Sequence, residues 1–148
     1  MRTDFNKVFF LISIFFLVGC SAIKQEGLSY KVECQALLSK EFKVKLPQPY
    51  HLQKENYEEG VACFYSFADG AYIIVFQGAM MKFTIDNYKP CKKRENKHRM
   101  VHSGIHNRKY WRKDIIDGVS VYYDNVTKEN KSLYNKILDD ISIINIKK

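Results

Sequence analysis

Apolar and polar residues alternate along several short stretches of the chain, which is the pattern of half-buried strands. Residues 42–46 read Phe-Lys-Val-Lys-Leu, and Pro47 ends the stretch because proline cannot donate to a sheet ladder. Two apolar runs, residues 61–68 and 71–77, flank the dipeptide Asp69-Gly70. An Asp-Gly pair between such runs is typical of a type I′ turn, so this pattern predicts a hairpin.

Other segments complete the predicted sheet. A second Asp-Gly pair, at residues 117–118, predicts another hairpin between residues 108–116 and 119–123. Residues 80–88 contain enough apolar positions for one more strand. Residues 50–60 are mostly polar and are predicted to form a loop.

Two segments favour helices. Residues 30–40 combine a few apolar positions with helix-compatible residues, which predicts a short N-terminal helix. Near the other end of the chain, Thr127 is a good N-cap, and Glu129 lies in the turn that follows. We therefore predict an α+β domain, in which a short N-terminal helix and a C-terminal amphipathic helix pack on an antiparallel sheet. The apolar stripe of the second helix comprises Leu133, Ile137, Leu138, Ile141 and Ile144.

The N-terminus has a different pattern. Arg2 and Lys7 precede an apolar run, residues 8–18, which is interrupted only by Ser13. As a helix this run spans about 16 Å, too short for a hydrocarbon core of about 30 Å. We therefore interpret residues 1–19 as an export signal rather than a membrane span.

The end of this leader contains a short motif. Residues 17–20, Leu-Val-Gly-Cys, resemble the lipobox of bacterial lipoproteins, in which the peptide is cut before the cysteine and the thiol is acylated. The resemblance implies that Cys20 carries lipid, and the mostly polar residues that follow make residues 20–29 a membrane tether. The length of the chain fits one domain, which we place at residues 30–148. An ordinary secretory signal, cut near Ala22, is the alternative.

The residue after the motif bears on location. Ser21, and not Asp, follows Cys20. By resemblance to Gram-negative lipoproteins, this implies a cell-envelope protein anchored in the outer membrane and facing the periplasm. An exported chain does not meet nucleic acid, so the formal net charge of +8 does not indicate a nucleic-acid partner.

An odd number of cysteines remains in the predicted domain. With Cys20 assigned to lipid, Cys34, Cys63 and Cys91 remain, and an oxidising compartment favours one disulfide and one free thiol. The sequence leaves all three pairings open. We favour Cys34 with Cys91, because Cys63 lies in an apolar run and is interpreted as a buried small hydrophobe.

The positive charge is concentrated in one segment. Residues 89–113 contain ten cations and a single acid, Glu95, and residues 89–107 are predicted to be an irregular basic loop. Such a cluster attracts anions, so we expect it to bind a protein or an anionic envelope polymer. The alternative is a solvated hairpin tip that only maintains solubility. The predicted patch comprises Lys92, Lys93, Arg94, Lys97, Arg99, Arg108, Lys109 and Arg112.

The sequence offers few features that indicate metal binding or catalysis. His98, His102 and His106 recur every four residues, and on a helix they could hold zinc or copper. Gly104 and the surrounding positive charge disfavour this, so no metal or cofactor is expected. The chain has no G-x-S-x-G, phosphate-cradling glycine loop or H-E-x-x-H motif. We expect a non-catalytic binding or assembly module; the alternative is an envelope enzyme or metal-binding protein that uses these histidines or a free cysteine.

The layout of residues 42–144 resembles the PsbP-like fold. The resemblance is carried by residues 42–47, the hairpin at Asp69-Gly70, residues 108–112 and the predicted closing helix that ends near residues 140–143. It implies a sheet covered by helices and a protein-binding role, with no shared catalytic residues.

Overall fold

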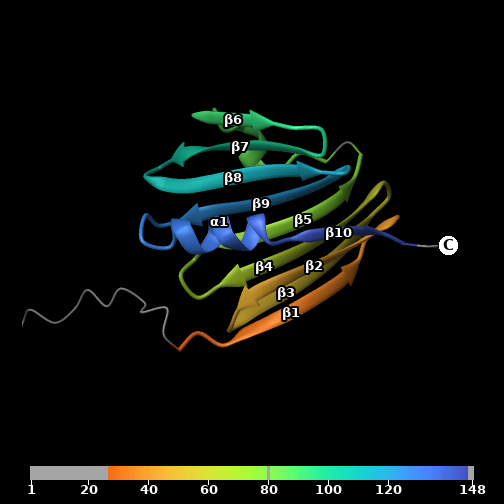
Figure 1. Ribbon diagram of the computed structural model, residues 1–148, viewed down its shortest axis with the longest axis horizontal. Coiled ribbons are helices and arrows are strands. Elements are labelled where there is room, and N and C mark those ends of the chain that lie inside the picture. The colour runs from red at the N-terminus through yellow and green to blue at the C-terminus, as the bar shows by residue number, and fades with distance from the viewer. Residues whose placement is uncertain (1–26, 80, 147–148) are drawn as a thin grey trace, which may run out of the picture.

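The computed structural model describes residues 27–79 and 81–146. The described chain forms two antiparallel sheets and one α-helix, α1 (Lys131–Asp139) (Figure 1). The small sheet has the order β1 (Tyr30–Ala36), β2 (Lys40–Pro47), β10 (Ser142–Asn145). The large sheet has the order β3 (Tyr50–Tyr57), β4 (Gly60–Phe67), β5 (Tyr72–Gly78), β9 (Val119–Val126), β8 (Lys109–Ile116), β7 (Arg99–His106), β6 (Lys92–Glu95).

The main core lies on one face of the large sheet. The small sheet and α1 cover this face, and α1 contacts β2, β8 and β9. Alternation along β2 turns Phe42, Val44 and Leu46 inward, where each is at most 2% exposed. They meet Ile73 of β5 and Leu138 of α1, which are fully buried. The alternating pattern of residues 42–46 therefore produces the predicted half-buried strand.

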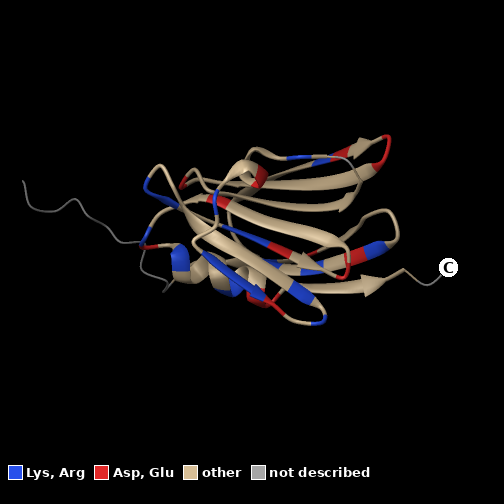
Figure 2. Ribbon diagram, turned by 90° about the horizontal axis from the view of Figure 1, so that it is seen from above, with Lys and Arg blue, Asp and Glu red and all other residues tan. Residues whose placement is uncertain are grey.

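A second core lies on the opposite face of the large sheet. The connection from β5 to β6 contains a 3₁₀-helix, Thr84–Asn87, and crosses this face. Figure 2 shows this short coil and α1 on opposite sides of the sheet. Buried Ile85 and the partly buried ring of Phe83 pack here, and Phe83 makes edge contacts with Phe76 and Tyr122. The large sheet is thus covered on both faces by parts of its own chain.

The predicted α+β class is wrong, because the N-terminal segment is a strand. Residues 30–36 form β1 and pair with β2 along their whole length, from Tyr30 opposite Pro47 to Ala36 opposite Glu41. The few apolar positions of residues 30–36 favour a helix only slightly. The backbone hydrogen bonds that β2 offers to these residues favour a strand more strongly. The described fold is essentially all-β, with α1 as its one α-helix.

Three other segments also differ from the prediction. Residues 50–57 form the edge strand β3, whose polar side chains reflect an exposed edge and not a loop. Residues 84–87 are a 3₁₀-helix instead of a strand. Within residues 89–107, β6 and β7 pair with each other, and β7 also pairs with β8. The predicted basic loop is therefore mostly strand, because charged side chains at the edge of a sheet can reach water.

Both predicted hairpins are present, although their turns differ. Asp117 and Gly118 have φ angles of 48° and 82°, as a type I′ turn requires. Between β4 and β5, a hydrogen bond of 3.0 Å from the Phe67 amide to the Ala71 carbonyl closes a loop of three residues, 68–70. Only Gly70 of this loop has a positive φ, 81°, so the type I′ prediction is wrong there.

The C-terminal helix is confirmed but is shorter than predicted. It begins after Asn130, whose amide donates to the Thr127 hydroxyl over 3.4 Å. Of the predicted stripe, Ile137, Leu138 and Ile141 are buried and Leu133 is partly buried, whereas Ile144 lies in β10 and is 52% exposed. The chain leaves the helix because β2 offers its second edge to β10. No helix in residues 27–79 and 81–146 is long and apolar enough to cross a bilayer.

Candidate functional site: a basic groove beside helix α1

A groove of about 370 Å³ lies between α1 and the strands β6, β7 and β8. Lys92 and Arg94 of β6 pair with Ser103 and Val101 of β7, and paired residues share a face of the sheet. Both cations therefore point to the α1 face, and Lys131 enters the groove from α1. We call this space, lined by these three cations, the basic groove.

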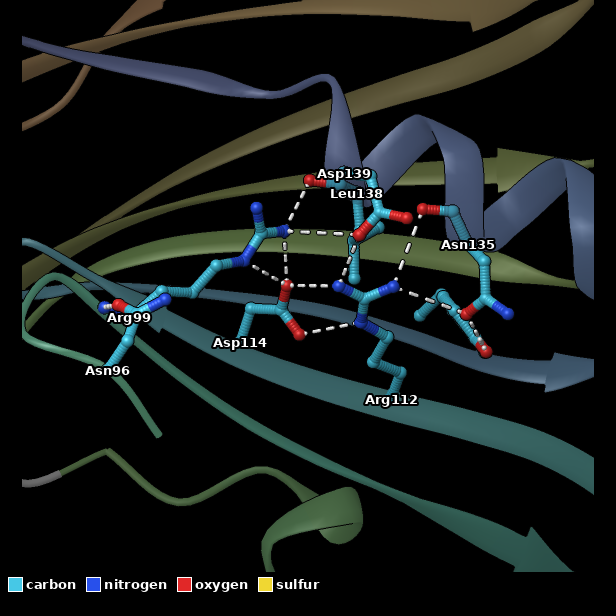
Figure 3. A network of polar contacts seen from close by, with 8 residues as sticks. Asn96, Arg99, Arg112, Asp114, Asn135, Leu138 and Asp139 are labelled. Carbon is cyan, nitrogen blue, oxygen red and sulfur yellow. Dashed lines mark hydrogen bonds and ion pairs between the residues drawn. The ribbon is translucent and has the colours of Figure 1, made fainter. Parts of the chain in front are cut away.

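An ion network centred on Arg112 forms the floor of the basic groove (Figure 3). Asp114 is fully buried and accepts two hydrogen bonds of 2.8 Å from the Arg112 guanidinium. Arg99 donates to the same carboxylate through Nε over 2.8 Å and reaches the Leu138 carbonyl through Nη2 over 2.6 Å. Arg112 also donates to Asp139 of α1 over 2.7 Å. Two cations and two carboxylates cancel, so the network adds rigidity and no net charge.

The protonation state of Arg112 follows from these contacts. Its side chain is 4% exposed, and burial by itself would lower the pKa of the guanidinium. The hydrogen bonds to Asp114 and Asp139 outweigh burial and raise that pKa. Arg112 therefore stays charged and cannot supply a proton to a ligand in the groove.

The helix side of the groove is held by polar contacts as well. The Tyr123 hydroxyl donates to Asn135 Oδ1 over 2.9 Å, and Arg112 Nη1 lies 3.3 Å from the same oxygen. The Lys131 ammonium lies 4.2 Å from the centre of the Tyr110 ring, within cation–π distance. These contacts fix the α1 side of the groove against β8 and β9 before any ligand arrives.

The groove carries an excess of positive charge. Within the part of the chain that the structure describes, Lys92, Arg94 and Lys131 take part in no ion pair. The carboxylate at the rim, Asp139, is 58% exposed and is already bound by Arg112. Three unneutralised cations beside a fixed floor create a local field that favours an anion.

The predicted patch is therefore divided among several places. Arg112 points inward to Asp114 because residues 112 and 114 share a face of β8, and Arg99 lies on the same face because it pairs with Ile116. Lys92 and Arg94 line the groove, and Lys93 between them points to the other face of β6. The turn between β6 and β7 holds Lys97, while Arg108 and Lys109 lie at the turn between β7 and β8.

Lys131 was missed because it is far from the basic segment in the sequence. One signal was available: Lys131 opens α1, where a cation opposes the helix dipole. No acidic residue lies in the first turn of α1 to offset this cation, which suggests that it has a use outside the helix.

The three cysteines of the described residues are free thiols. Cys63 is fully buried, as predicted, and burial raises the pKa of its thiol. Cys34 lies on β1, whereas Cys91 directly precedes β6, and these strands lie at opposite edges of the molecule in Figure 1. The structure thus does not contain the bridge predicted between Cys34 and Cys91. Cys20, the predicted lipid site, lies outside the described residues.

The three histidines do not lie on a helix. His102 and His106 are on β7, and His98 precedes it, so each interval of four residues is about 13 Å of strand. His106 stacks on Tyr88 with ring centres 4.0 Å apart, and His98 Nδ1 lies 3.6 Å from Asp117. No group of three metal-ligating side chains is found in residues 27–79 and 81–146.

Comparison of the chain with protein-family models, with curated proteins and with solved structures gives no match. The resemblances to bacterial lipoproteins and to the PsbP-like fold therefore rest on the sequence motifs alone.

Proposed function

We propose that this protein is a non-catalytic binding module of the cell envelope, tethered to the outer membrane by lipid on Cys20. Its basic groove would receive an anionic group of a protein or of an acidic envelope polymer. The observation that carries the proposal is the convergence of Lys92, Arg94 and Lys131 on a groove whose floor, Arg112, is already fixed. Because Asp114 and Asp139 already hold the Arg112 floor, an anion that binds in the groove does not have to order it.

The size and lining of the groove support a short acidic segment as the ligand. Its volume of about 370 Å³ is at the lower end of the range for small-molecule sites and exceeds that of a single ion. Tyr110 and Ile105 add apolar surface, and Ile105 is 52% exposed. A carboxylate- or phosphate-bearing sugar or an acidic peptide would satisfy both the charge and these apolar walls.

The same lining supports a binding role over a catalytic one. The nucleophilic groups at the groove are Cys91 and Ser103, and no histidine lines it among the described residues. Asp139 is engaged by Arg112 and so is a poor general base. This arrangement can hold an anion, and it offers no activated nucleophile.

The test measures the affinity of the full chain for lipopolysaccharide, which carries phosphate and carboxylate groups, at low and high salt. Each exposed charge contributes about 1 kcal/mol or less, so reversing Lys92, Arg94 and Lys131 to Glu should weaken binding roughly ten- to a hundredfold. The matched control reverses Lys43, Lys45 and Lys82, three exposed cations outside the groove. Equal losses in both triple variants would contradict the proposal.

The anchor is tested separately. Mass spectrometry of the N-terminal peptide of the native protein should find Cys20 as the first residue, with lipid on its sulfur. A bare thiol at Cys20, or a retained leader, would contradict the membrane-tethered part of the proposal.

A further inference from the structure

The connections of the fold gather at two ends. The pairings of Tyr30 with Pro47 and of Tyr110 with Val126 show that β1 and β8 begin where β2 and β9 end. The β2–β3, β4–β5 and β7–β8 turns and the β9–α1 connection therefore share one end with the start of β1, at the left of Figure 1. The β3–β4, β6–β7 and β8–β9 turns lie at the opposite end.

These two ends differ in charge. The first end carries Lys92, Arg108, Lys109, Lys128 and Lys131 against Asp69, Asp124 and Glu129. We call it the basic end. The second, which we call the acidic end, carries Glu58, Glu59, Glu95 and Asp117 against Lys40 and Lys97. Figure 2 shows basic residues at the start of α1 on the left and an acidic loop at the upper right.

Among the acids of the basic end, Glu129 is exposed, whereas Asp69 and Asp124 accept hydrogen bonds from other residues of the fold. Asp69 is turned toward the fold, where it accepts hydrogen bonds from Asn130 over 2.8 Å and from Tyr134 over 3.1 Å. Arg108 occupies the tip of the β7–β8 turn with a φ of 63°, a left-handed conformation that favours glycine. The turn thus holds a cation at its tip in spite of a backbone cost.

The described chain also enters at the basic end. It begins at Gly27, three residues before β1, and Cys20 precedes Gly27 by seven residues. Seven extended residues reach at most about 25 Å. A lipid on Cys20 would therefore keep the basic end close to the membrane surface.

We propose that the basic end is a docking surface for the anionic phospholipid head groups of the membrane that carries the anchor. An anionic surface attracts the basic end and repels the acidic end, so the strands stand away from the membrane with the acidic turns outermost. Ile105, 52% exposed beside the β7–β8 turn, supplies an apolar side chain at the same surface. This inference rests on the proposed lipidation of Cys20, and it adds an orientation to the tethered module.

The experiment uses the full lipidated chain in vesicles of phosphatidylglycerol and phosphatidylcholine that contain a photoactivatable phosphatidylcholine. Cross-linked peptides are identified by mass spectrometry. We expect cross-links to concentrate on residues 105–109 and 127–131. The yield of these cross-links should fall about tenfold in high salt, and by a similar factor in the variant Arg108→Glu/Lys109→Glu/Lys128→Glu. None of these three substitutions changes a cation that lines the basic groove.

A matched control reverses three cations away from the basic end, Lys40, Lys43 and Lys97, and should leave the cross-links unchanged. Circular dichroism checks that both variants are folded. Cross-links spread evenly over both ends, or equal effects of the two triple variants, overturn the inference while the N-terminal peptide still carries lipid. If that peptide carries no lipid, the proposed function and this inference fail together.

Discussion

Replacing Asp114 by Asn tests whether the Arg112 network holds α1 on the sheet. Asp114 is fully buried, and its two oxygens receive both Arg99 and Arg112. Arg99 is 22% exposed and can turn toward water, whereas Arg112 is 4% exposed and cannot. The cost therefore comes mainly from one buried guanidinium without its carboxylate.

Breaking a buried ion pair from one side costs about 3–5 kcal/mol. Domains of this size are stable by about 5–15 kcal/mol, so Asp114→Asn should remove at least about a fifth of the folding free energy. In urea, with a slope of about 2 kcal/mol per molar, the unfolding midpoint should fall by about 2 M. The measurement is equilibrium unfolding followed by tryptophan fluorescence, since Trp111 is 2% exposed in the fold.

Asp139→Asn is the matched control. Asp139 binds the same guanidinium but is 58% exposed, so its loss should cost about 1 kcal/mol or less. The double variant Arg112→Met/Asp114→Leu replaces the charges by apolar side chains and should recover at least half of the loss. If Asp114→Asn is no more destabilising than Asp139→Asn, the network does not hold the helix as described.

Three further predictions concern single residues. Hydrogen bonds from Lys31 and Tyr50 lower the pKa of Glu33, so its stabilising effect is present above the ordinary glutamate pKa of about 4.3 and is lost as pH falls below it. Unfolding of Glu33→Gln should therefore depend less on pH in that acidic range. Cys34 and Cys91 are exposed, so an alkylating reagent should label both in the native chain without prior reduction. It should label Cys63 only after unfolding. Arg108→Gly should raise the unfolding free energy by about 0.5–1 kcal/mol, because glycine relieves the left-handed turn.

Each of these has a contrary result. If the unfolding of Glu33→Gln depends on pH as much as that of the native chain, then folding does not change the pKa of the Glu33 carboxyl. Labelling of the exposed cysteines only after reduction would reveal a disulfide that this structure lacks. A loss of stability in Arg108→Gly would show that the arginine side chain makes a contact worth more than the backbone strain.

The candidate site could be predicted only in part. The excess of cations in residues 89–113 is visible in the sequence, and Lys92 and Arg94 do line the groove. The inward direction of Arg112 was harder to see, although Arg112 and Asp114 lie two apart on a predicted strand. Two opposite charges at that spacing share a face, which is a signal of a buried ion pair when the same face is otherwise apolar.

Local chemistry determined those features that depend on a few neighbouring residues. The alternation at residues 42–46, the two Asp-Gly hairpins, the buried Cys63 and the helix after Thr127 all follow from side-chain period or turn preference. Only the tertiary structure decided that residues 30–36 are a strand, because their conformation depends on hydrogen bonds that β2 supplies. The basic groove also required it, since Lys131 meets Lys92 only after α1 folds across the sheet. Which end of the fold is basic depends likewise on strand register, a property of pairs of strands that no single segment contains.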